Sequence, residues 1–223
     1  MCGRFTIKTS LQKIIEAMSP VLAKLDPTLF LPRYNVAPSQ SPPIVRLDSS
    51  GQRVLEFARW GFVPAWTKGK PKLAPINAKC ETAVTSGMYR SAFAKRRCLV
   101  PADGFYEWKG AKPPKQPFYI HRKDDGVFAF AGLWERWKPD EEAEPVDTFT
   151  ILTTSPNELM ANIHNRMPVI IDRSDYGAWL EKGDAKLLKP APTEAMEAYP
   201  VSTKVNKPSH DQADCVERIV ASC

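Results

Sequence analysis

Residues 118–134, FYIHRKDDGVFAFAGLW, indicate the class of fold more clearly than other stretches of the chain. Aromatic and aliphatic residues, which favour strands, fill the runs 118–122 and 127–134. Between these runs, residues 124–126 are Asp-Asp-Gly, and Asp-Gly favours the tight turn that joins two neighbouring antiparallel strands. The stretch therefore predicts a β-hairpin and points to an antiparallel sheet.

The same alternation of apolar runs and turns continues on both sides of this segment. Residues 44–47 and 54–60 are predicted to form a second hairpin through the Asp-Ser-Ser-Gly sequence at 48–51. Further strands are predicted at 98–108, 148–153, 169–171 and 199–205. Pro200 lacks an amide hydrogen, so the last of these strands suits the edge of a sheet.

Helical segments are fewer and shorter. Apolar residues recur at helical spacing within 11–18, directly after Thr9 and Ser10, either of which can cap a helix. Pro20 interrupts the pattern, and one or two further turns are expected up to residue 25. Two short helices are expected at 156–163 and 174–180, with Gly183 ending the second.

Together these elements predict one mixed α+β domain over residues 1–223. Its sheet is mainly antiparallel and curled toward a barrel, with the helices packed outside. A chain of 223 residues can bury a sizeable core. Its 21 scattered prolines, against 11 glycines, favour short strands and loops over long helices.

The composition limits which cell compartment and which classes of partner are expected. The five cysteines are odd in number, widely spaced and without C-x-x-C pairs, which is a poor match to a disulfide framework or a zinc site. No stretch approaches the ~20 apolar residues of a membrane span, and the start lacks a secretory signal. We expect a cytoplasmic monomer that uses no metal or cofactor and contacts no membrane.

The charge of the chain favours a polyanionic partner. The formal net charge is +6, and lysines and arginines gather in 68–72, 95–97 and 109–115, whereas acidic residues gather in 140–144. A basic face attracts nucleic acid, although many proteins of similar charge bind none. The charge therefore permits, but does not by itself establish, a nucleic-acid partner.

Cys2 is the first candidate for covalent chemistry. If Met1 is removed, the chain begins with an α-amine and a thiol two carbons apart. Both groups are partly nucleophilic near neutral pH. Such a 1,2-aminothiol can condense with an aldehyde, first to an imine and then to a five-membered thiazolidine ring. The plain alternative is that Cys2 only follows the start codon, so reactivity depends on partners elsewhere in the chain.

Two titratable residues are candidates for proton transfer. Glu107 lies in an aromatic strand, on the same face as Phe105, where desolvation of the charged form favours a general acid near neutral pH. His164 follows a predicted short helix, and histidine is the usual proton shuttle at neutral pH. The plain alternatives are a solvent-facing glutamate and a structural histidine.

Three further side chains suit a ligand site. Asn77 can orient a terminal amine or serve as a turn residue. Arg166, two residues after His164, can bind a phosphate through two parallel hydrogen bonds. Trp66, between Pro64 and Lys68, is the best candidate for an exposed aromatic residue that stacks on an unpaired base.

These residues lie in motifs that resemble the SOS response-associated peptidase family. The motifs are Met1 to Phe5, Arg33 to Pro38, Trp60 to Trp66, Ile76 to Ala78, Glu81-Thr82, Arg97 to Trp108 and His164 to Pro168, followed by Tyr199 to Ser202 and Val205-Asn206. They span nearly the whole chain in the order typical of the family, so the match is specific.

The resemblance implies a function in DNA damage. Members of the family detect abasic sites in single-stranded DNA. The residue that matches Cys2 condenses with the aldehyde of the abasic sugar and forms a reversible thiazolidine crosslink, which shields the lesion. The implied activity is lyase-like DNA processing, with proposed self-removal of Met1. The implied location is the cytoplasm, in association with the nucleoid.

The resemblance also implies roles for individual residues. Cys2 would be the nucleophile, Asn77 would position its amine, and Glu107 and His164 would transfer protons at the sugar. Phosphates would be held by Arg4, Asn35, Lys79 and Arg166, while Pro38 and Trp66 would wedge against the flanking bases. Lys79 stands where an arginine is expected. A lysine ammonium binds a phosphate as a point charge, whereas an arginine guanidinium can donate two parallel hydrogen bonds to it.

Two other functions compete with this hypothesis. Cys2 and His164 could form a thiol peptidase, whose activity on a general peptide substrate would distinguish it. The chain could also be a non-covalent nucleic-acid-binding module, in which case Cys2→Ala would leave binding unchanged.

Overall fold

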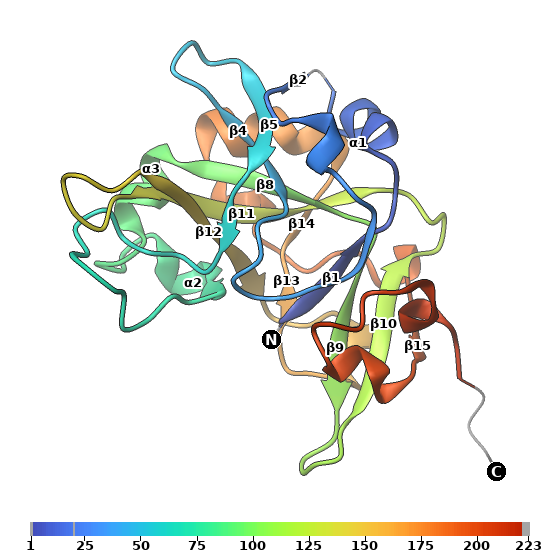
Figure 1. Cartoon of the computed structure of the whole chain (residues 1–223). Helices are drawn as coiled ribbons and strands as arrows, with labels where there is room; N and C mark the ends of the chain where they lie inside the picture. Colours follow the sequence, from blue (N-terminus) through green and yellow to red (C-terminus); the bar gives the residue numbers. More distant parts are fainter. Residues whose placement is uncertain (1, 20, 220–223) are drawn as a thin grey trace.

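The computed structural model describes residues 2–19 and 21–219, which form two β-sheets with short helices around them (Figure 1). The first sheet has the strand order β15-β10-β9-β1-β3, and all its neighbours are antiparallel. Its strands are β1 (Arg4–Ile7), β3 (Arg33–Val36), β9 (Gly104–Lys109), β10 (Gln116–Arg122) and β15 (Met196–Pro200). The predicted mixed α+β class is confirmed.

The second sheet is larger and has the main order β13-β12-β11-β8-β4-β5-β2. These strands are β2 (Leu22–Ala23), β4 (Pro43–Leu47), β5 (Arg53–Phe57), β8 (Arg97–Ala102), β11 (Phe128–Trp137), β12 (Val146–Thr154) and β13 (Met167–Pro168). Beside this path, β14 (Ile170–Ile171) pairs with β11, while β6 (Arg59–Trp60) and β7 (Asn77–Lys79) run parallel to β12.

The hairpin predicted around residues 124–126 is wrong. β10 and β11 are both strands, but they belong to different sheets, so the Asp-Asp-Gly turn carries the chain from one sheet to the other. The Arg122 guanidinium bonds the Asp124 carboxylate at 2.9 and 2.7 Å and stabilises this connection. The local turn signal was correct, whereas the pairing depends on distant strands. The other predicted hairpin, β4 with β5, is confirmed.

The predicted strand 98–108 is likewise divided between the sheets. It breaks at Asp103, between β8 and β9. The buried Asp103 carboxylate accepts bonds from the Thr6 hydroxyl at 2.5 Å and the Thr9 amide at 2.9 Å. The chain therefore changes sheets at Asp103 and again at 124–126.

The predicted curling toward a barrel stops short of closure. Within the described residues neither sheet closes on itself, and the strand orders end at β15 and β3 in one sheet and at β13 and β2 in the other. Aromatic rings fill the space between the sheets instead. Phe130 of β11 makes edge-to-face contacts with Phe5 and Phe105, each at 5.9 Å between ring centroids. Such pairs stabilise a packed interface.

The helices are short. The α-helices are α1 (Leu11–Met18), α2 (Cys80–Ala83), α3 (Arg90–Lys95) and α4 (Glu158–Ala161). Single 3-10 turns lie at Pro27–Leu29, Arg173–Asp175, Ala185–Leu187, Thr193–Ala195, Thr203–Asn206 and Ala213–Val216, with a π-helical turn at Ala178–Lys182. None of the helices among the described residues is long and apolar enough to cross a membrane.

Three helical and strand boundaries differ from prediction. α1 is confirmed, but the further turns expected up to residue 25 are replaced by β2, which pairs with β5. The predicted helix 174–180 forms as two separate turns and ends, as expected, at Gly183 with φ +65°. β15 begins at Met196 and ends at Pro200, at the expected sheet edge. The Ser202 side chain then caps the turn Thr203–Asn206.

Candidate functional site

The site is built around the start of β1, which lies between β9 and β3. Figure 1 shows β1 beside β9. The register pairs Arg4 with Tyr106, so Cys2 and Gly3 continue alongside Glu107. The Cys2 side chain is completely buried. The pairing of β1 with β9 therefore brings the predicted nucleophile and the predicted acid together.

Asn77 holds the backbone of Cys2. Its Nδ2 donates a 2.8 Å hydrogen bond to the Cys2 carbonyl oxygen. Asn77 begins β7, whose parallel pairing with β12 fixes its position through Ile151. The Asn77 Oδ1 atom is buried and has no hydrogen-bond partner among the described residues. The amide thus fixes the carbonyl side of Cys2 and retains an acceptor within the site.

Glu107 and His164 form a pair beside Cys2. Glu107 Oε1 lies 3.8 Å from His164 Nε2, and the glutamate is only 2% exposed. The Arg166 amide donates a 3.1 Å bond to His164 Nδ1. The Arg166 carbonyl lies 3.3 Å from the same nitrogen, so the ring is held by its Nδ1 side and turns Nε2 toward Glu107. The pair can therefore pass a proton between a buried carboxylate and a partly exposed ring.

Burial controls the state of the Cys2 thiol. Desolvation, and after it the negative charge of Glu107, raise the pKa of this thiol well above its usual range. The thiol is therefore protonated at neutral pH in this structure. A reaction at sulfur then needs a nearby group that accepts the proton, and Glu107 is a charged neighbour of the right type.

Arg4 and Asn35 are placed differently from the prediction. Asn35 is completely buried, and its Nδ2 donates bonds to the carbonyls of Val205, Lys207 and His210 at 2.7 to 3.1 Å. Arg4 donates to Asn35 Oδ1 at 2.9 Å and to the Val205 carbonyl at 2.6 Å. Arg4 thus attaches the late segment 203–210 to the start of β1 and Asn35 attaches it to β3, and Asn35 presents no surface to a phosphate.

Arg166 is already paired. Its guanidinium makes two bonds to the Glu81 carboxylate, at 2.6 and 2.7 Å, and a third to the Thr153 carbonyl. These bonds lower the pKa of Glu81 to about 2. The Arg166 guanidinium that was predicted to bind a phosphate therefore already binds the Glu81 carboxylate. A phosphate would have to displace this carboxylate.

The three remaining predicted contacts lie on the surface. Lys79, Pro38 and Trp66 are all exposed, and the Trp66 side chain is 69% exposed. This exposure agrees with the expectation for Trp66 and leaves all three accessible to a large ligand.

The family is shown by comparison of the whole sequence. The sequence model of the family described as SOS response associated peptidase (SRAP) matches residues 1–208. This chain belongs to the SRAP family. The abasic site processing protein YoqW of Bacillus subtilis is 40% identical, over 97% of this chain and 99% of that protein. The abasic site processing protein HMCES of Gallus gallus is 32% identical, over 84% of this chain and 66% of that protein.

Solved structures share the SRAP fold described above. A protein from Bacteroides thetaiotaomicron has a TM-score of 0.83 and 28% identity, with 97% of this chain and 100% of that chain covered. A phage-related protein from Bordetella bronchiseptica has a TM-score of 0.72 and 30% identity, with 90% and 94% covered.

The sequence patterns did not assign two residues of this SRAP chain, Glu81 and Asp211, to the site. Glu81 lies within a recognised motif, but only its contact with Arg166 reveals its importance. Asp211 accepts bonds from the amides of Tyr34 and Asn35 at 2.6 and 2.7 Å and thereby holds the edge strand β3. No local pattern around Asp211 indicates this contact, because it joins positions 177 and 176 residues apart.

One side-chain cluster has the residue types of a metal site. The ligand atoms of His210, Asp214 and Cys215 lie within 4.8 Å of one another. However, Asp214 already accepts bonds from His210 Nε2 at 2.7 Å and from the Lys204 ammonium at 2.9 Å. Both carboxylate oxygens of Asp214 are therefore already engaged, one of them by a positive charge, so these residues fit a structural network better than a metal site.

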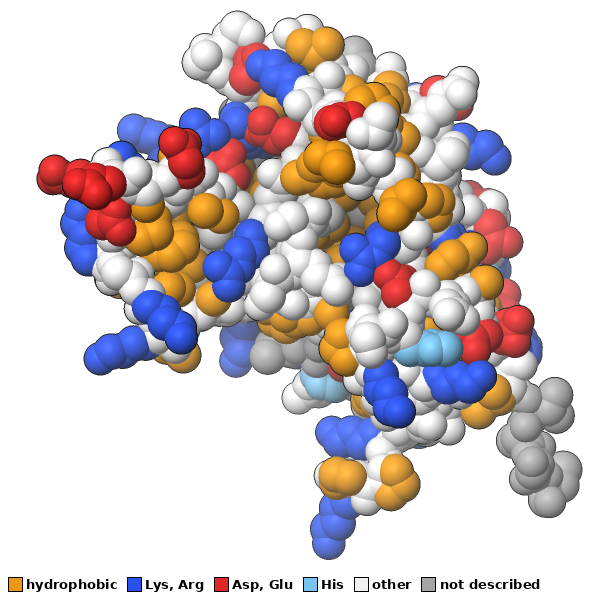
Figure 2. All heavy atoms as spheres, in the orientation of Figure 1, with side chains coloured by type: hydrophobic (Ala, Val, Ile, Leu, Met, Phe, Trp, Pro, Cys, Tyr) orange, Lys and Arg blue, Asp and Glu red, His pale blue; other side chains and the backbone are white. Residues whose placement is uncertain are grey.

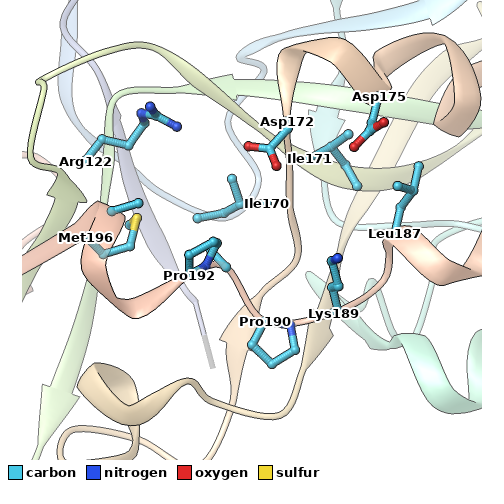
Figure 3. Close-up of a pocket in the computed structure, with 12 residues that line it drawn as sticks. Arg122, Ile170, Ile171, Asp172, Asp175, Leu187, Lys189, Pro190, Pro192 and Met196 are labelled. Atoms are coloured by element: carbon cyan, nitrogen blue, oxygen red, sulfur yellow. The ribbon is translucent and has the colours of Figure 1, made fainter.

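A separate cavity of about 440 Å³ lies between β10, β14 and the segment around Pro190 (Figure 3). Arg122, Asp172, Asp175 and Lys189 supply its charged groups. None of the predicted site residues lines it. The candidate reactive centre is therefore the cluster of Cys2, Asn77, Glu107 and His164 rather than this cavity.

Proposed function

We propose that this SRAP protein binds abasic sites in single-stranded DNA covalently, through a reversible thiazolidine at Cys2. The observation that carries the proposal is the convergence of Asn77 and Glu107 on the start of the chain. Asn77 bonds the Cys2 carbonyl at 2.8 Å, and Glu107 with His164 supplies a proton-transfer pair beside the thiol. The names of the relatives, abasic site processing proteins, support the choice of substrate.

The proposed chemistry begins after removal of Met1, which lies outside the described residues. The free α-amine of Cys2 attacks the C1′ aldehyde of the ring-opened abasic sugar and forms a carbinolamine. Loss of one water gives the imine. The Cys2 sulfur then adds to the imine carbon while its proton moves to the nitrogen. The product is a thiazolidine, and the net reaction releases one water.

Glu107 and His164 are proposed to move the protons of this sequence. Glu107 would exchange protons with the sugar during ring opening and loss of water, and would relay the proton of the Cys2 thiol to the nitrogen. This relay is needed because burial raises the pKa of that thiol. His164 Nε2 faces Glu107 and would exchange protons with it and with the sugar. Reversal of the crosslink would use the same groups in the opposite order.

The DNA contacts are proposed to fall into two groups. Lys79, Pro38 and Trp66 are exposed and would contact the strand directly. Arg166 would bind a phosphate after release of Glu81. Arg4 and Asn35 would act indirectly, because their polar groups hold β1 and β3 to the segment 203–210.

The thiol peptidase alternative, with Cys2 and His164, has weaker support. A peptidase of this type needs a thiolate, and thus a lowered thiol pKa. Burial instead raises the pKa of Cys2. A terminal residue with its own amine also suits imine chemistry better than hydrolysis of a general peptide.

A denaturing gel tests the proposed function. The Met1-processed protein is incubated with a single strand that carries one abasic site, beside undamaged DNA and Cys2→Ala. We expect a slow-migrating species that needs both the lesion and Cys2. Cys98→Ala, which removes another buried thiol, is the matched control and should still form it. Absence of the species, with processing confirmed by mass, would overturn the proposal.

A further inference from the structure

The cavity between β10, β14 and the segment around Pro190 is separate from the reactive centre and has a ligand chemistry of its own (Figure 3). We propose that this cavity binds a small zwitterion with an aliphatic body, such as a free aliphatic amino acid or a short aliphatic peptide. The ammonium of the ligand would bind Asp172 and Asp175, and its carboxylate would bind Lys189. This inference does not depend on the proposed function.

The size and the apolar floor of the cavity suit a small organic molecule. Its volume is about 440 Å³, within the range of about 300–1,000 Å³ that is typical of ligand pockets. Most of the side chains that line it are apolar, among them Ile170, Leu187, Pro190, Pro192 and Met196. A ligand with an aliphatic body would therefore remove apolar surface from water when it binds.

The walls of the cavity are held by the fold. Ile170 lies in β14, which pairs with β11 of the larger sheet. Arg122 and Met196 are partners in the ladder of β10 and β15. The Ala191 carbonyl accepts a 2.9 Å bond from Asn157 Nδ2. A ligand would therefore meet a surface that is already in place, as in most ligand pockets.

One of the four charged groups around the cavity is neutralised within the protein. The Arg122 guanidinium makes two bonds to the Asp124 carboxylate, at 2.9 and 2.7 Å. Asp172, Asp175 and Lys189 differ, because none of them forms an ion pair within 4.0 Å among residues 2–19 and 21–219. The free charges of the cavity are therefore two carboxylates and one ammonium.

This set of charges differs from that of the general surface. On the face drawn in Figure 2, lysine and arginine side chains project along the lower edge, in keeping with the net charge of +6. In the cavity, Asp172 and Asp175 lie along one side, and the Lys189 side chain extends toward the same space from below (Figure 3). The cavity thus places charges of both signs around an apolar floor.

A zwitterion fits this arrangement better than an ion of one sign. A cation without a carboxylate would leave the Lys189 ammonium unpaired, and an anion would face the carboxylates of Asp172 and Asp175. An α-ammonium can donate hydrogen bonds to both carboxylates, and such charge-assisted bonds are stronger than neutral ones. The Lys189 ammonium can bind a carboxylate as a point charge. The aliphatic side chain of the ligand would then lie on Ile170 and Pro192.

Isothermal titration of the full chain tests the inference. Two probes are zwitterions, L-leucine and L-leucyl-L-leucine. Two blocked forms of the dipeptide serve as comparison: N-acetyl-leucyl-leucine lacks the ammonium, and leucyl-leucine amide lacks the carboxylate. The cavity variants are Asp172→Asn/Asp175→Asn and Lys189→Met, which remove the charges and keep similar side-chain shapes.

Matched control variants remove exposed charges elsewhere. They are Glu141→Gln/Glu144→Gln and Lys182→Met, and none of these residues lines the cavity. The melting temperature of each variant without ligand, measured beforehand, shows that the variant is folded.

We expect a zwitterion to saturate the parent protein and the controls with a midpoint of about 0.1–1 mM. The blocked dipeptides should bind about 5-fold more weakly or worse, because each loses one ionic contact. Asp172→Asn/Asp175→Asn should weaken binding of leucyl-leucine by a similar factor and leave binding of the acetylated form unchanged. Lys189→Met should show the same pattern with the amide, because a lost charge matters only when its partner is present.

Saturation by L-leucine would identify a free amino acid as the ligand, and saturation by the dipeptide alone would identify a short peptide. Either result, with the expected dependence on charge, supports the inference. Absence of saturation by both zwitterions would overturn it. Equal or tighter binding of the blocked dipeptides would do the same, as would equal binding by the cavity variants and their controls.

Discussion

The charged groups of the reactive centre are paired, whereas those of the lysine groove around Trp66 (Lys68, Lys70 and Lys72) form no ion pair among the described residues. At the centre, Glu107 faces His164, and Arg166 is bonded to Glu81. In the groove, the lysines form no ion pair within the described chain and surround an exposed tryptophan. Under the proposed function this difference would divide the tasks: the centre would be arranged before DNA binds, whereas the exposed lysines would attract the DNA.

Glu107→Gln tests the chemistry of the centre and should give the largest effect. The amide keeps the shape of the side chain but cannot exchange the proton, so crosslinking should slow by about 10²- to 10⁴-fold. Single-turnover time courses on denaturing gels measure the rates of formation and reversal. Glu141→Gln, an exposed glutamate in the acidic run, is the control and should change neither rate. Unchanged formation and reversal in Glu107→Gln would disprove its role in proton transfer.

Asn77→Ala tests whether the centre depends on a fixed nucleophile. Loss of the bond to the Cys2 carbonyl should let the start of the chain move, and small misplacements of a reacting group cost about 10²-fold in rate. The affinity for undamaged DNA should stay the same, because Asn77 contacts Cys2 rather than the groove. A loss of affinity equal to the loss of rate would mean that Asn77 binds DNA instead.

Asn35→Ala tests the indirect role assigned to a predicted phosphate ligand. The change removes donors to three carbonyls in a completely buried position, so unfolding free energy should fall by about 1–3 kcal/mol. Chemical denaturation measures this loss. The salt dependence of DNA binding should be unaffected. A reduced salt dependence with unchanged stability would restore the original assignment of Asn35 as a phosphate contact.

Glu81→Gln tests whether Arg166 is held away from DNA. The bonds from Arg166 lower the pKa of Glu81 to about 2, and the glutamate side chain is 49% exposed. An ion pair this exposed contributes about 0–1 kcal/mol, so its removal should tighten DNA binding by at most about 5-fold. Anisotropy with undamaged single strands measures the change. Weaker binding would instead mean that Glu81 positions Arg166 for the phosphate.

The same pair gives a small effect of pH on stability. Because the pKa of folded Glu81 is lowered from an ordinary value of about 4.3, its stabilisation is present above that value. It is lost as the pH falls through about 2. The difference in melting temperature between the parent protein and Glu81→Gln should therefore be largest above pH 5 and vanish near pH 2. A difference that grows toward low pH would contradict this assignment.

The sequence alone predicts most elements of the fold but not their assembly. α1, the hairpin of β4 and β5, and the β10 and β11 strands follow from spacing and turn residues. The division of β10 and β11 between two sheets does not, because it is decided by their pairing with β9 and β12. Whether a sheet that curls toward a barrel also closes could not be predicted for the same reason, since closure depends on which strands lie at the edges.

The candidate site shows the same limit. Motifs identify Cys2, Asn77, Glu107 and His164 as a set, and the structure brings them together. They do not reveal that Asn35 is buried or that Arg166 is bonded to Glu81. A motif indicates which residues belong to one site, whereas the partners of a side chain depend on contacts between positions far apart, such as 81 and 166.

The most direct test of the central claim is the covalent bond itself. A tryptic digest of the protein–DNA adduct should yield the peptide Cys2-Gly3-Arg4, without Met1, joined to the abasic sugar with the loss of one water. Its sulfur should resist alkylation, because the thiazolidine uses both the amine and the thiol. Attachment of the DNA at a lysine, or a Cys2 sulfur that is still free to alkylate, would contradict the account.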